Sequence, residues 1–345
     1  MNLEIQREYF GVLLPYIENE TITDITWNGR KLWIDDLKKG RYAASLKLET
    51  AFLDQFAARI ANLANVNFNR SQPILEAETA DLRISMIDRS VTNTDCTLAI
   101  RKTPAVRRLA DRTMIEQNYA SAEVLEFLEA AVKGRCSILV TGDVGSGKTE
   151  LVKYLTKFIA PYERTISIED NFELRLSAIN PELDCVEMKV AGEFSYEQAI
   201  KAALRQMCRW MLLSEARGRE VNYLLEAAST GCSVMTTIHS DDVRKLPDRM
   251  MNMIGTGSAE RQNDIYSFFD VGIRVDARNS GDGIRRRISQ ICVLDRDRGR
   301  NCLQLLYQDG SWLDWVLPEN MIKKLKRADA FQYLPETARC RKEVK

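Results

Sequence analysis

The stretch 136-CSILVTGDVGSGKTELVKYL-155 decides the fold. An apolar run leads into a loop with three glycines, and a helix-forming segment starts at Lys148 and Thr149. Glycines let successive backbone N–H groups curl around a phosphate, and the N-terminus of the following helix adds partial positive charge. The pattern therefore predicts a phosphate-binding loop between a buried strand and a helix.

The residues of this loop have separate expected tasks. Lys148 would bridge the β- and γ-phosphates of a bound nucleotide, and the Thr149 hydroxyl would bind Mg²⁺. The alternative is a glycine-rich turn with a surface lysine, and the strand–loop–helix context weighs against it. The predicted nucleotide-binding residues are Gly142, Asp143, Val144, Gly145, Ser146, Gly147, Lys148, Thr149 and Glu150.

Strands and helices alternate around the loop. The expected strands are "CSILVTG", "RTISIED", "RWMLLSE" and "SVMTTIH", separated by helices such as "KTELVKYLTKFI" and "SYEQAIKAALRQM". Such alternation predicts a mostly parallel sheet with helices on both faces, whose catalytic residues gather beyond the carboxyl ends of the strands.

Three of these strands end in polar side chains: Glu169, Glu215 and His239, the only histidine of the chain. A helix cap or a solvated corner explains any one of them, whereas three together beside a phosphate loop favour a site. One carboxylate can hold Mg²⁺ while the other orients or deprotonates the attacking water.

The first part of the chain predicts a smaller α+β domain over residues 1–102. Asn28-Gly29 is a favoured hairpin turn pair, "TAFLDQFAARIANLANV" has helical spacing with Thr50 as its cap, and "DLRISMI" and "CTLAIRK" are expected strands. Residues 103–120 have only weak periodicity and are expected to form a linker. Residues 121–345 would form the second domain, which opens with a helix ended by Gly134.

Composition excludes some classes of function. The 49 basic and 49 acidic residues cancel, which removes the overall attraction to a phosphate backbone, so direct nucleic-acid binding is not expected. No apolar run reaches the roughly 18 residues of a membrane span, and no signal peptide is recognisable, so a cytoplasmic protein is expected.

The cysteines contain no CxxC pair and indicate reduced thiols, with neither zinc nor disulfides. They are Cys96, Cys136, Cys185, Cys208, Cys232, Cys292, Cys302 and Cys340. Near the C-terminus, "ENMIKKLKRADAF" is expected to be an amphipathic basic helix. A solvated helix face and a docking patch explain its charges equally well.

From about Ile22 to Arg296 the sequence resembles the secretion ATPase superfamily. These are hexameric motors of type II and type IV secretion, conjugation and Tad-type pili, and the VirB11/CpaF branch is the most similar. The resemblance is carried by "GDVGSGKTE" as the Walker A loop, "RTISIEDNFELRL" as the Asp box, "LRQMCRWMLLSEARGRE" as the Walker B segment and "STGCSVMTTIHS" as the His box. It implies a RecA-like P-loop NTPase core, ATP and Mg²⁺ as cofactors, and a homo-hexamer.

The resemblance also implies roles for individual residues. Glu169 would polarise the attacking water, Glu215 would support Mg²⁺, and His239 would sense the γ-phosphate. Arg83 and Arg101 match arginines that reach the nucleotide from the N-terminal domain, and strand-end arginines that face water remain the alternative for both.

Some positions depart from the family pattern. They are Met207-Cys208-Arg209 and Ser214 around the Walker B strand, Glu150 after the Walker A threonine, and Cys232 in the His box. They mark a divergent member, and the absence of a four-cysteine module argues against the type II branch.

The function implied by the resemblance is an ATP-hydrolysing ring motor for type IV secretion, conjugative transfer or Tad-type pilus assembly. Its partners would be membrane-embedded channel proteins, and it would associate peripherally with the inner face of the cell membrane. A hinge in residues 103–120 would let ATP binding move the N-terminal domain. The alternatives are a non-hydrolysing nucleotide-gated scaffold of the same machine, a RecA-like nucleic-acid translocase and a small-molecule P-loop kinase.

Overall fold

The computed structural model describes residues 3–255, 259–279, 283–314 and 316–340, and the side chains of all of these except residues 279, 339 and 340. The chain divides into two compact units: unit 1 is Met1–Pro104 with Arg278–Arg285, and unit 2 is Ala105–Ala277 with Arg286–Lys345. The division after Pro104 falls within the range expected as a linker. Met114 and Tyr119, which also lie in that range, are buried in the core of unit 2.

Unit 1 is built on a six-stranded antiparallel sheet with the order β3-β2-β1-β6-β5-β4. Its strands are β1 (Ile22–Trp27), β2 (Leu32–Asp36), β3 (Gly40–Ala43), β4 (Ile74–Glu78), β5 (Leu82–Ile87) and β6 (Thr97–Lys102). Its helices are η1 (Arg7–Leu13), α1 (Leu14–Glu18), α2 (Thr50–Ala64) and η2 (Arg89–Val91). The predicted hairpin forms between β1 and β2, and β3 and β4 were not predicted.

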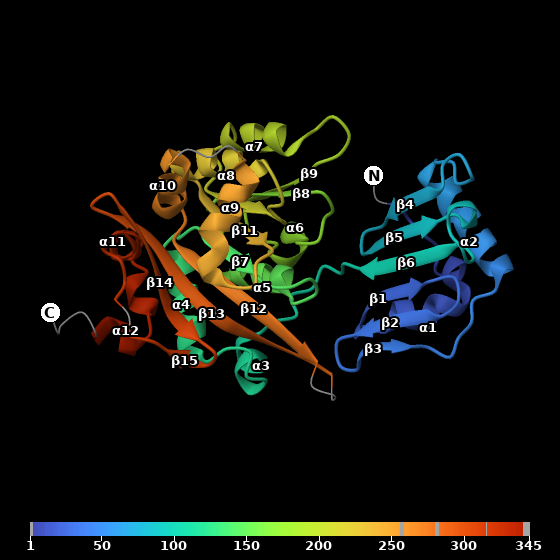
Figure 1. The fold of residues 1–345 in the computed structure, drawn as a ribbon, viewed down its shortest axis with the longest axis horizontal. Helices are drawn as coiled ribbons and strands as arrows, with labels where there is room; N and C mark the ends of the chain where they lie inside the picture. Colours follow the sequence, from blue (N-terminus) through green and yellow to red (C-terminus); the bar gives the residue numbers. More distant parts are fainter. Residues whose placement is uncertain (1–2, 256–258, 280–282, 315, 341–345) are drawn as a thin grey trace. The chain divides into compact units, whose positions relative to one another are not determined.

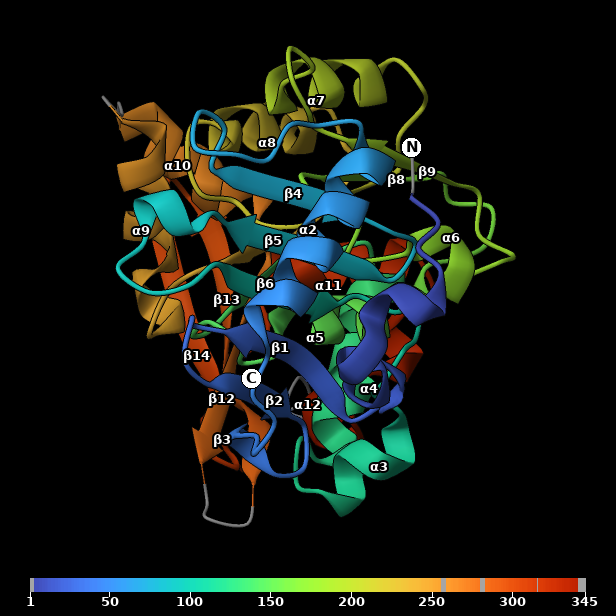
Figure 2. The same cartoon turned by 90° about the vertical axis from the view of Figure 1, so that its right-hand side faces the viewer.

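Helix α2 covers one face of this sheet (Figure 2). Buried and half-buried residues alternate along β2 and β5, as expected for strands with one face on a core. Leu53, Phe56 and Ile60 of α2 are buried in that core. The prediction that Thr50 caps α2 is wrong: Glu49 is the N-cap residue, and the Thr50 hydroxyl, already in the first turn, donates to Asp95 Oδ2 at 2.6 Å.

Unit 2 contains a nine-stranded sheet with the order β15-β14-β13-β12-β7-β11-β10-β8-β9. The six strands from β12 to β9 pair in parallel, and β13, β14 and β15 pair antiparallel. Its strands are β7 (Ile138–Thr141), β8 (Thr165–Glu169), β9 (Cys185–Lys189), β10 (Trp210–Leu213), β11 (Ser233–Ile238), β12 (Val271–Asn279), β13 (Ile284–Asp297), β14 (Arg300–Gln308) and β15 (Ser311–Trp312). The predicted strands β7, β8, β10 and β11 all form, whereas the antiparallel extension is a feature that sequence reasoning missed.

Helices cover both faces of this sheet, with α4 and α11 on one face and α7, α8, α9 and α10 on the other (Figure 1). The helices of unit 2 are α3 (Asp111–Glu116), α4 (Ala122–Lys133), α5 (Lys148–Leu155), η3 (Thr156–Phe158), α6 (Leu176–Ile179), α7 (Tyr196–Leu204), α8 (Glu220–Ser229), η4 (Val243–Lys245), α9 (Leu246–Ile254), α10 (Ala259–Phe268), α11 (Glu319–Arg327), η5 (Phe331–Tyr333) and α12 (Glu336–Cys340). None of the described helices combines the length and apolar character that a membrane crossing needs.

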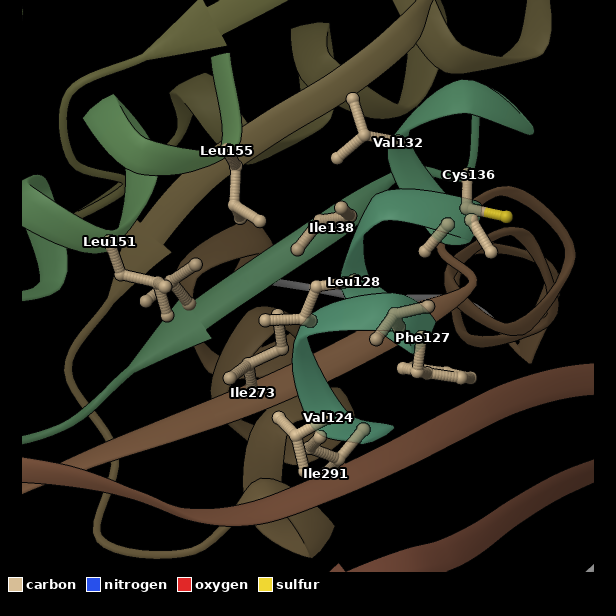
Figure 3. Close-up of a cluster of buried hydrophobic side chains, with 14 of the residues drawn as sticks. Val124, Phe127, Leu128, Val132, Cys136, Ile138, Leu151, Leu155, Ile273 and Ile291 are labelled. Atoms are coloured by element: carbon tan, nitrogen blue, oxygen red, sulfur yellow. The ribbon is translucent and has the colours of Figure 1, made fainter. Parts of the chain in front are cut away.

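Each face of the sheet has its own hydrophobic core. Ile138 and Leu139 are successive residues of β7 and belong to opposite clusters, as the period of two in a strand requires. Figure 3 shows the first cluster, in which Val124 and Leu128 of α4 lie near Ile273 of β12. The two cores fix the strands whose carboxyl ends carry the candidate site.

The C-terminal helix α11 is part of the first core. Its apolar side chains Met321, Ile322 and Leu325 are buried. Gly134, which ends α4 as predicted, has an ordinary φ of −75°, but a Cβ there would lie 2.5 Å from Leu325 Cδ2. Glycine therefore permits the close approach of α11 rather than a left-handed turn.

Candidate nucleotide-binding site

The loop between β7 and α5 needs its glycines. Gly145 and Gly147 have φ values of 74° and 99°, in the left-handed region that side chains disfavour. A Cβ on Gly142 would lie 2.2 Å from the carbonyl oxygen of Val275. Ser146 Oγ is buried in this loop without a hydrogen-bond partner among the described residues. A backbone cradle with an unsatisfied hydroxyl fits a phosphate group.

Lys148 lies at the start of α5 and is 8% exposed. Its Nζ donates to the carbonyl oxygens of Gly142 and Asp143, each at 3.0 Å, and lies 3.4 Å from His239 Nδ1. Burial lowers the pKa of Lys148 because the charged form loses hydration. The ammonium group is thus held over its own loop by two backbone carbonyl oxygens, beside the His239 ring.

The ends of β10 and β11 bring His239 and Glu215 together. His239 Nε2 lies 2.8 Å from Glu215 Oε1, while Arg217 donates to Glu215 Oε2 at 2.6 Å. Arg217 also lies 3.5 Å from Asp170 Oδ2, which follows β8. Together with the Lys148 contact, these distances form a continuous chain of polar side chains across three strand ends.

Glu169, at the end of β8, is fully buried. Its Oε2 accepts hydrogen bonds from the backbone N–H groups of Glu173 and Leu174 at 2.9 and 3.0 Å, and its Oε1 has no partner among the described residues. Burial raises the pKa of Glu169 to about 7, and the two N–H groups oppose this shift only in part. A carboxyl group with this pKa can exchange a proton near neutral pH.

Oxygen ligands suited to Mg²⁺ are present at the loop. Thr149 is half-buried in the first turn of α5, and the Glu215 side chain is 16% exposed. A hydroxyl and a carboxylate beside a phosphate cradle fit the preference of Mg²⁺ for oxygen donors, phosphate and water. Glu150 is directed elsewhere, because its Oε1 lies 3.2 Å from Arg108 and 3.5 Å from Lys153.

Arg83 and Arg101 lie in unit 1. They are directly opposite each other on β5 and β6 and alternate with buried residues, so they face away from the core of that unit. Arg101 Nε donates to Asp24 Oδ1 at 2.7 Å. Their expected approach to the nucleotide stays a prediction.

Two arginines near the loop were missed by sequence reasoning. Arg217 had a usable signal, since it follows the acidic end of β10 by two residues. Arg286 on β13 had none, yet its Nε and one terminal nitrogen lie 3.4 Å from Gly145 O. Arg286 lies beside the phosphate loop only because strands that are distant in the sequence belong to one sheet.

Residues 55–266 match the family described as "Type II/IV secretion system protein". The chain belongs to this family. Its relatives include an uncharacterized Bacillus anthracis protein, 25% identical over 344 residues, with 94% of this chain and 78% of the relative covered. A putative conjugal transfer protein of Mycobacterium tuberculosis is 26% identical over 313 residues, covering 84% and 86%. The type IV secretion system protein PtlH of Bordetella pertussis is 32% identical over 183 residues, covering 49% and 53%.

Solved structures of similar fold agree with the family match. The ATPase DotB of Yersinia pseudotuberculosis has a TM-score of 0.64 at 14% identity, with 84% of this chain and 80% of DotB covered. The DotB of Legionella pneumophila has a TM-score of 0.61 at 18% identity, covering 84% and 82%. The pilus retraction motor PilT has a TM-score of 0.56 at 18% identity, covering 94% and 87%. The predicted fold class and the resemblance to type II/IV secretion proteins are thereby confirmed.

Proposed function

We propose that this secretion-family protein is an ATP-hydrolysing motor that energises type IV secretion or conjugative transfer, with assembly of a Tad-type pilus as the related possibility. One observation carries the proposal. Lys148, His239 and Glu215 meet through contacts of 3.4 Å or less next to a glycine loop that fits phosphate. The PtlH and conjugal transfer relatives support the choice of machine.

The triphosphate would bind to polar groups of the glycine loop and of the first turn of α5. Backbone N–H groups of the loop and the Ser146 hydroxyl would hold the phosphates, and the Lys148 ammonium would exchange two carbonyl oxygens for the β- and γ-phosphates. Thr149 and Glu215 would hold Mg²⁺, directly or through water. The metal ion would neutralise charge that develops on the phosphates.

Hydrolysis requires a base for the attacking water. We assign this role to Glu169, whose raised pKa allows its carboxylate to accept the proton of the water as the water oxygen attacks the γ-phosphorus and ADP leaves. In the described conformation the Glu169 carboxyl is closed to solvent, so the 170–174 segment has to open for this step. His239, between Lys148 and Glu215, would report loss of the γ-phosphate.

The motor would act as a ring. We propose a homo-hexamer with head-to-tail interfaces that complete each nucleotide site, with Arg83 and Arg101 reaching the nucleotide from unit 1. Membrane-embedded channel proteins would be its partners at the inner face of the cell membrane. We place the hinge for nucleotide-driven movement in residues 103–120.

Lys148→Ala tests the site. Without the ammonium group the transferred phosphoryl loses its main cationic partner, so we expect hydrolysis to fall by about 100-fold or more. Phosphate release from ATP and Mg²⁺ is the measurement. Lys201→Ala makes the same change at an exposed lysine of α7 paired with Glu197 and should leave the rate unchanged. Equal hydrolysis by parent and Lys148→Ala protein would refute the assignment.

A further inference from the structure

Arg286 of β13 crosses the backbone of the phosphate loop. Its Nε and one terminal nitrogen both lie 3.4 Å from the Gly145 carbonyl oxygen. Its Cδ lies 3.4 Å from the position that a Cβ on Gly147 would take. The stem of this arginine therefore rests on the loop, and its guanidinium group reaches the edge of the cradle.

The charge of Arg286 has no acidic partner among the described residues. Two nearby arginines do have such partners: Arg287 of β13 pairs with Asp309, and Arg274 of β12 pairs with Asp276 at 2.9 Å. Arg286 is half-buried and contacts only a neutral carbonyl oxygen, through two long hydrogen bonds. Burial lowers its pKa by disfavouring the cation. A partly desolvated cation without a counter-ion is costly unless an anion binds beside it.

The groups near the Arg286 guanidinium leave room for an external anion to bind it. The carboxylate of Glu150, in the first turn of α5, is already engaged by Arg108 and Lys153. Tyr119 fixes β13 at this point, because its carbonyl oxygen accepts a hydrogen bond from the Ile288 N–H at 2.8 Å. Arg286 is thus held at the loop by the sheet, and it forms no ion pair of its own among the described residues, although the Glu150 carboxylate favours its charge from a distance.

We propose that Arg286 is a nucleotide-binding residue that contacts the α- and β-phosphates, the part shared by ATP and ADP. The inference rests on the proposed function. Backbone groups of a P-loop cradle the α- and β-phosphates, and Gly145 and Gly147 belong to that cradle. The cluster of Lys148, His239 and Glu215 would extend to the γ-phosphate, with Lys148 bridging it to the β-phosphate, whereas Arg286 contacts none of these three side chains. A guanidinium group can donate two parallel hydrogen bonds to phosphate oxygens.

The test measures the Kd of ADP and of a nonhydrolysable ATP analogue, both with Mg²⁺, for the parent and Arg286→Gln proteins. Loss of a charge-assisted contact should raise both Kd values by about 10-fold or more and by similar factors. At saturating ATP, kcat should stay within about threefold of the parent value, because a contact present before and after cleavage adds uniform binding. Arg286→Lys keeps the positive charge but lacks the two parallel N–H donors of the guanidinium group, so it should recover part of the affinity for both nucleotides.

Arg287→Gln is the matched control, since it removes the next guanidinium on β13, which pairs with Asp309. Both Kd values should match those of the parent. Unchanged binding in both Arg286 variants, or weaker binding of the ATP analogue alone, would overturn the proposal. Should Arg286→Gln fail to fold, the Arg286→Lys protein decides, because unchanged ADP binding there contradicts a bidentate contact.

Lys148→Ala separates this proposal from the one on which it depends. A Lys148→Ala protein that binds the ATP analogue and ADP and hydrolyses ATP as the parent does would refute the nucleotide site as a whole. Loss of ATP-analogue binding in Lys148→Ala, together with parent-like binding in the Arg286 variants, would refute only the role of Arg286.

Discussion

Each end of the parallel sheet in unit 2 carries a buried carboxylate, and the two carboxylates, Asp270 and Glu169, differ in the partners that they have. At the amino end, Asp270 precedes β12, and its two oxygens accept hydrogen bonds from Lys324 Nζ, each at 2.7 Å. Asp270 Oδ2 also accepts from the Ser137 N–H at 2.7 Å. At the carboxyl end, Glu169 Oε1 and Ser146 Oγ have no hydrogen-bond partner among the described residues.

This difference indicates that the paired carboxylate stabilises the fold, whereas the incompletely paired one takes part in ligand binding or reaction. A buried charge with a full set of partners holds its neighbours in one arrangement, and here it ties α11 to the start of β12. A buried polar group left without a partner costs stability and persists where a ligand or a reaction supplies the missing contact. Changes at the amino end should therefore affect folding, and changes at the carboxyl end should affect nucleotide chemistry.

The largest effect is expected for Asp270→Ala. Loss of the carboxylate leaves the Lys324 ammonium and the Ser137 N–H without their acceptor, so the free energy of unfolding should fall by about 3 kcal/mol. This value is at the lower end of the usual range because the Lys324 side chain is 39% exposed. Urea unfolding measures the loss.

The same Asp270→Ala protein, while folded, should bind ADP with the Kd of the parent. The control is Lys323→Met, which removes an exposed lysine on α11 paired with Glu319. It should change neither stability nor binding measurably. A normal unfolding energy in Asp270→Ala, or a changed Kd, would remove the distinction between the two ends.

The second effect is the pH dependence of the free energy of unfolding that the Glu169 carboxyl group causes. Its pKa is about 7 in the folded protein against an ordinary value of 4.5, so between these pH values the folded state holds one proton more than the unfolded state. The free energy of unfolding of the parent should therefore fall by roughly 3 kcal/mol as pH rises from 4.5 to about 7. Glu169→Gln should lack this contribution, which urea unfolding at pH 4.5 and pH 8 can measure.

Activity gives an independent readout of the same residue. The parent kcat should rise with pH through about 7, because only the deprotonated carboxylate accepts a proton from water. Glu169→Gln should hydrolyse ATP about 100-fold more slowly. Glu182→Gln, at an exposed position, should behave as the parent in both experiments. A difference in stability between Glu169→Gln and the parent that is the same at both pH values would contradict the assigned pKa.

Sequence reasoning predicted the part of the fold that local pattern determines. Apolar runs that end in Glu169, Glu215 and His239 are typical of buried parallel strands, and all three formed with their polar residues at one edge of the sheet. The glycine pattern of the loop has a local physical cause, which explains why it was found from the sequence alone.

The missed parts depend on tertiary contacts. Strand β9 is short and half-buried along its whole length at the sheet edge, while β13 carries several arginines that hide its strand character. The place of Arg286 at the loop follows from the position of β13 in the sheet order, and no pattern around the residue encodes it. Thr50 resembles a helix cap, but its distant partner Asp95 determines where the hydroxyl points.

The smallest effect is expected at two thiols that lie just before β10 and β11, at the amino end of the sheet. Cys208 and Cys232 have their Sγ atoms 3.3 Å apart, and Cys208 Sγ donates to the Trp210 carbonyl oxygen at 3.1 Å. The Cys232 thiol and burial hold the pKa of Cys208 above its usual range, so this thiol stays neutral at pH 7. Cys208→Ala should lower the free energy of unfolding by about 1 kcal/mol, because a partly buried sulfur and its contacts are lost.

Because both thiols precede the strands whose far ends carry Glu215 and His239, Cys208→Ala also tests whether the two ends are independent. A substitution before β10 should not move the residues at the far end of the strand as long as the strand keeps its hydrogen-bonded register. Trp210 should stay paired with Thr165 and Ser233. Steady-state hydrolysis and the Kd of ADP should therefore equal the parent values. A several-fold fall in kcat at unchanged stability would show that the amino end of β10 positions the site, and the division between the two ends would no longer hold.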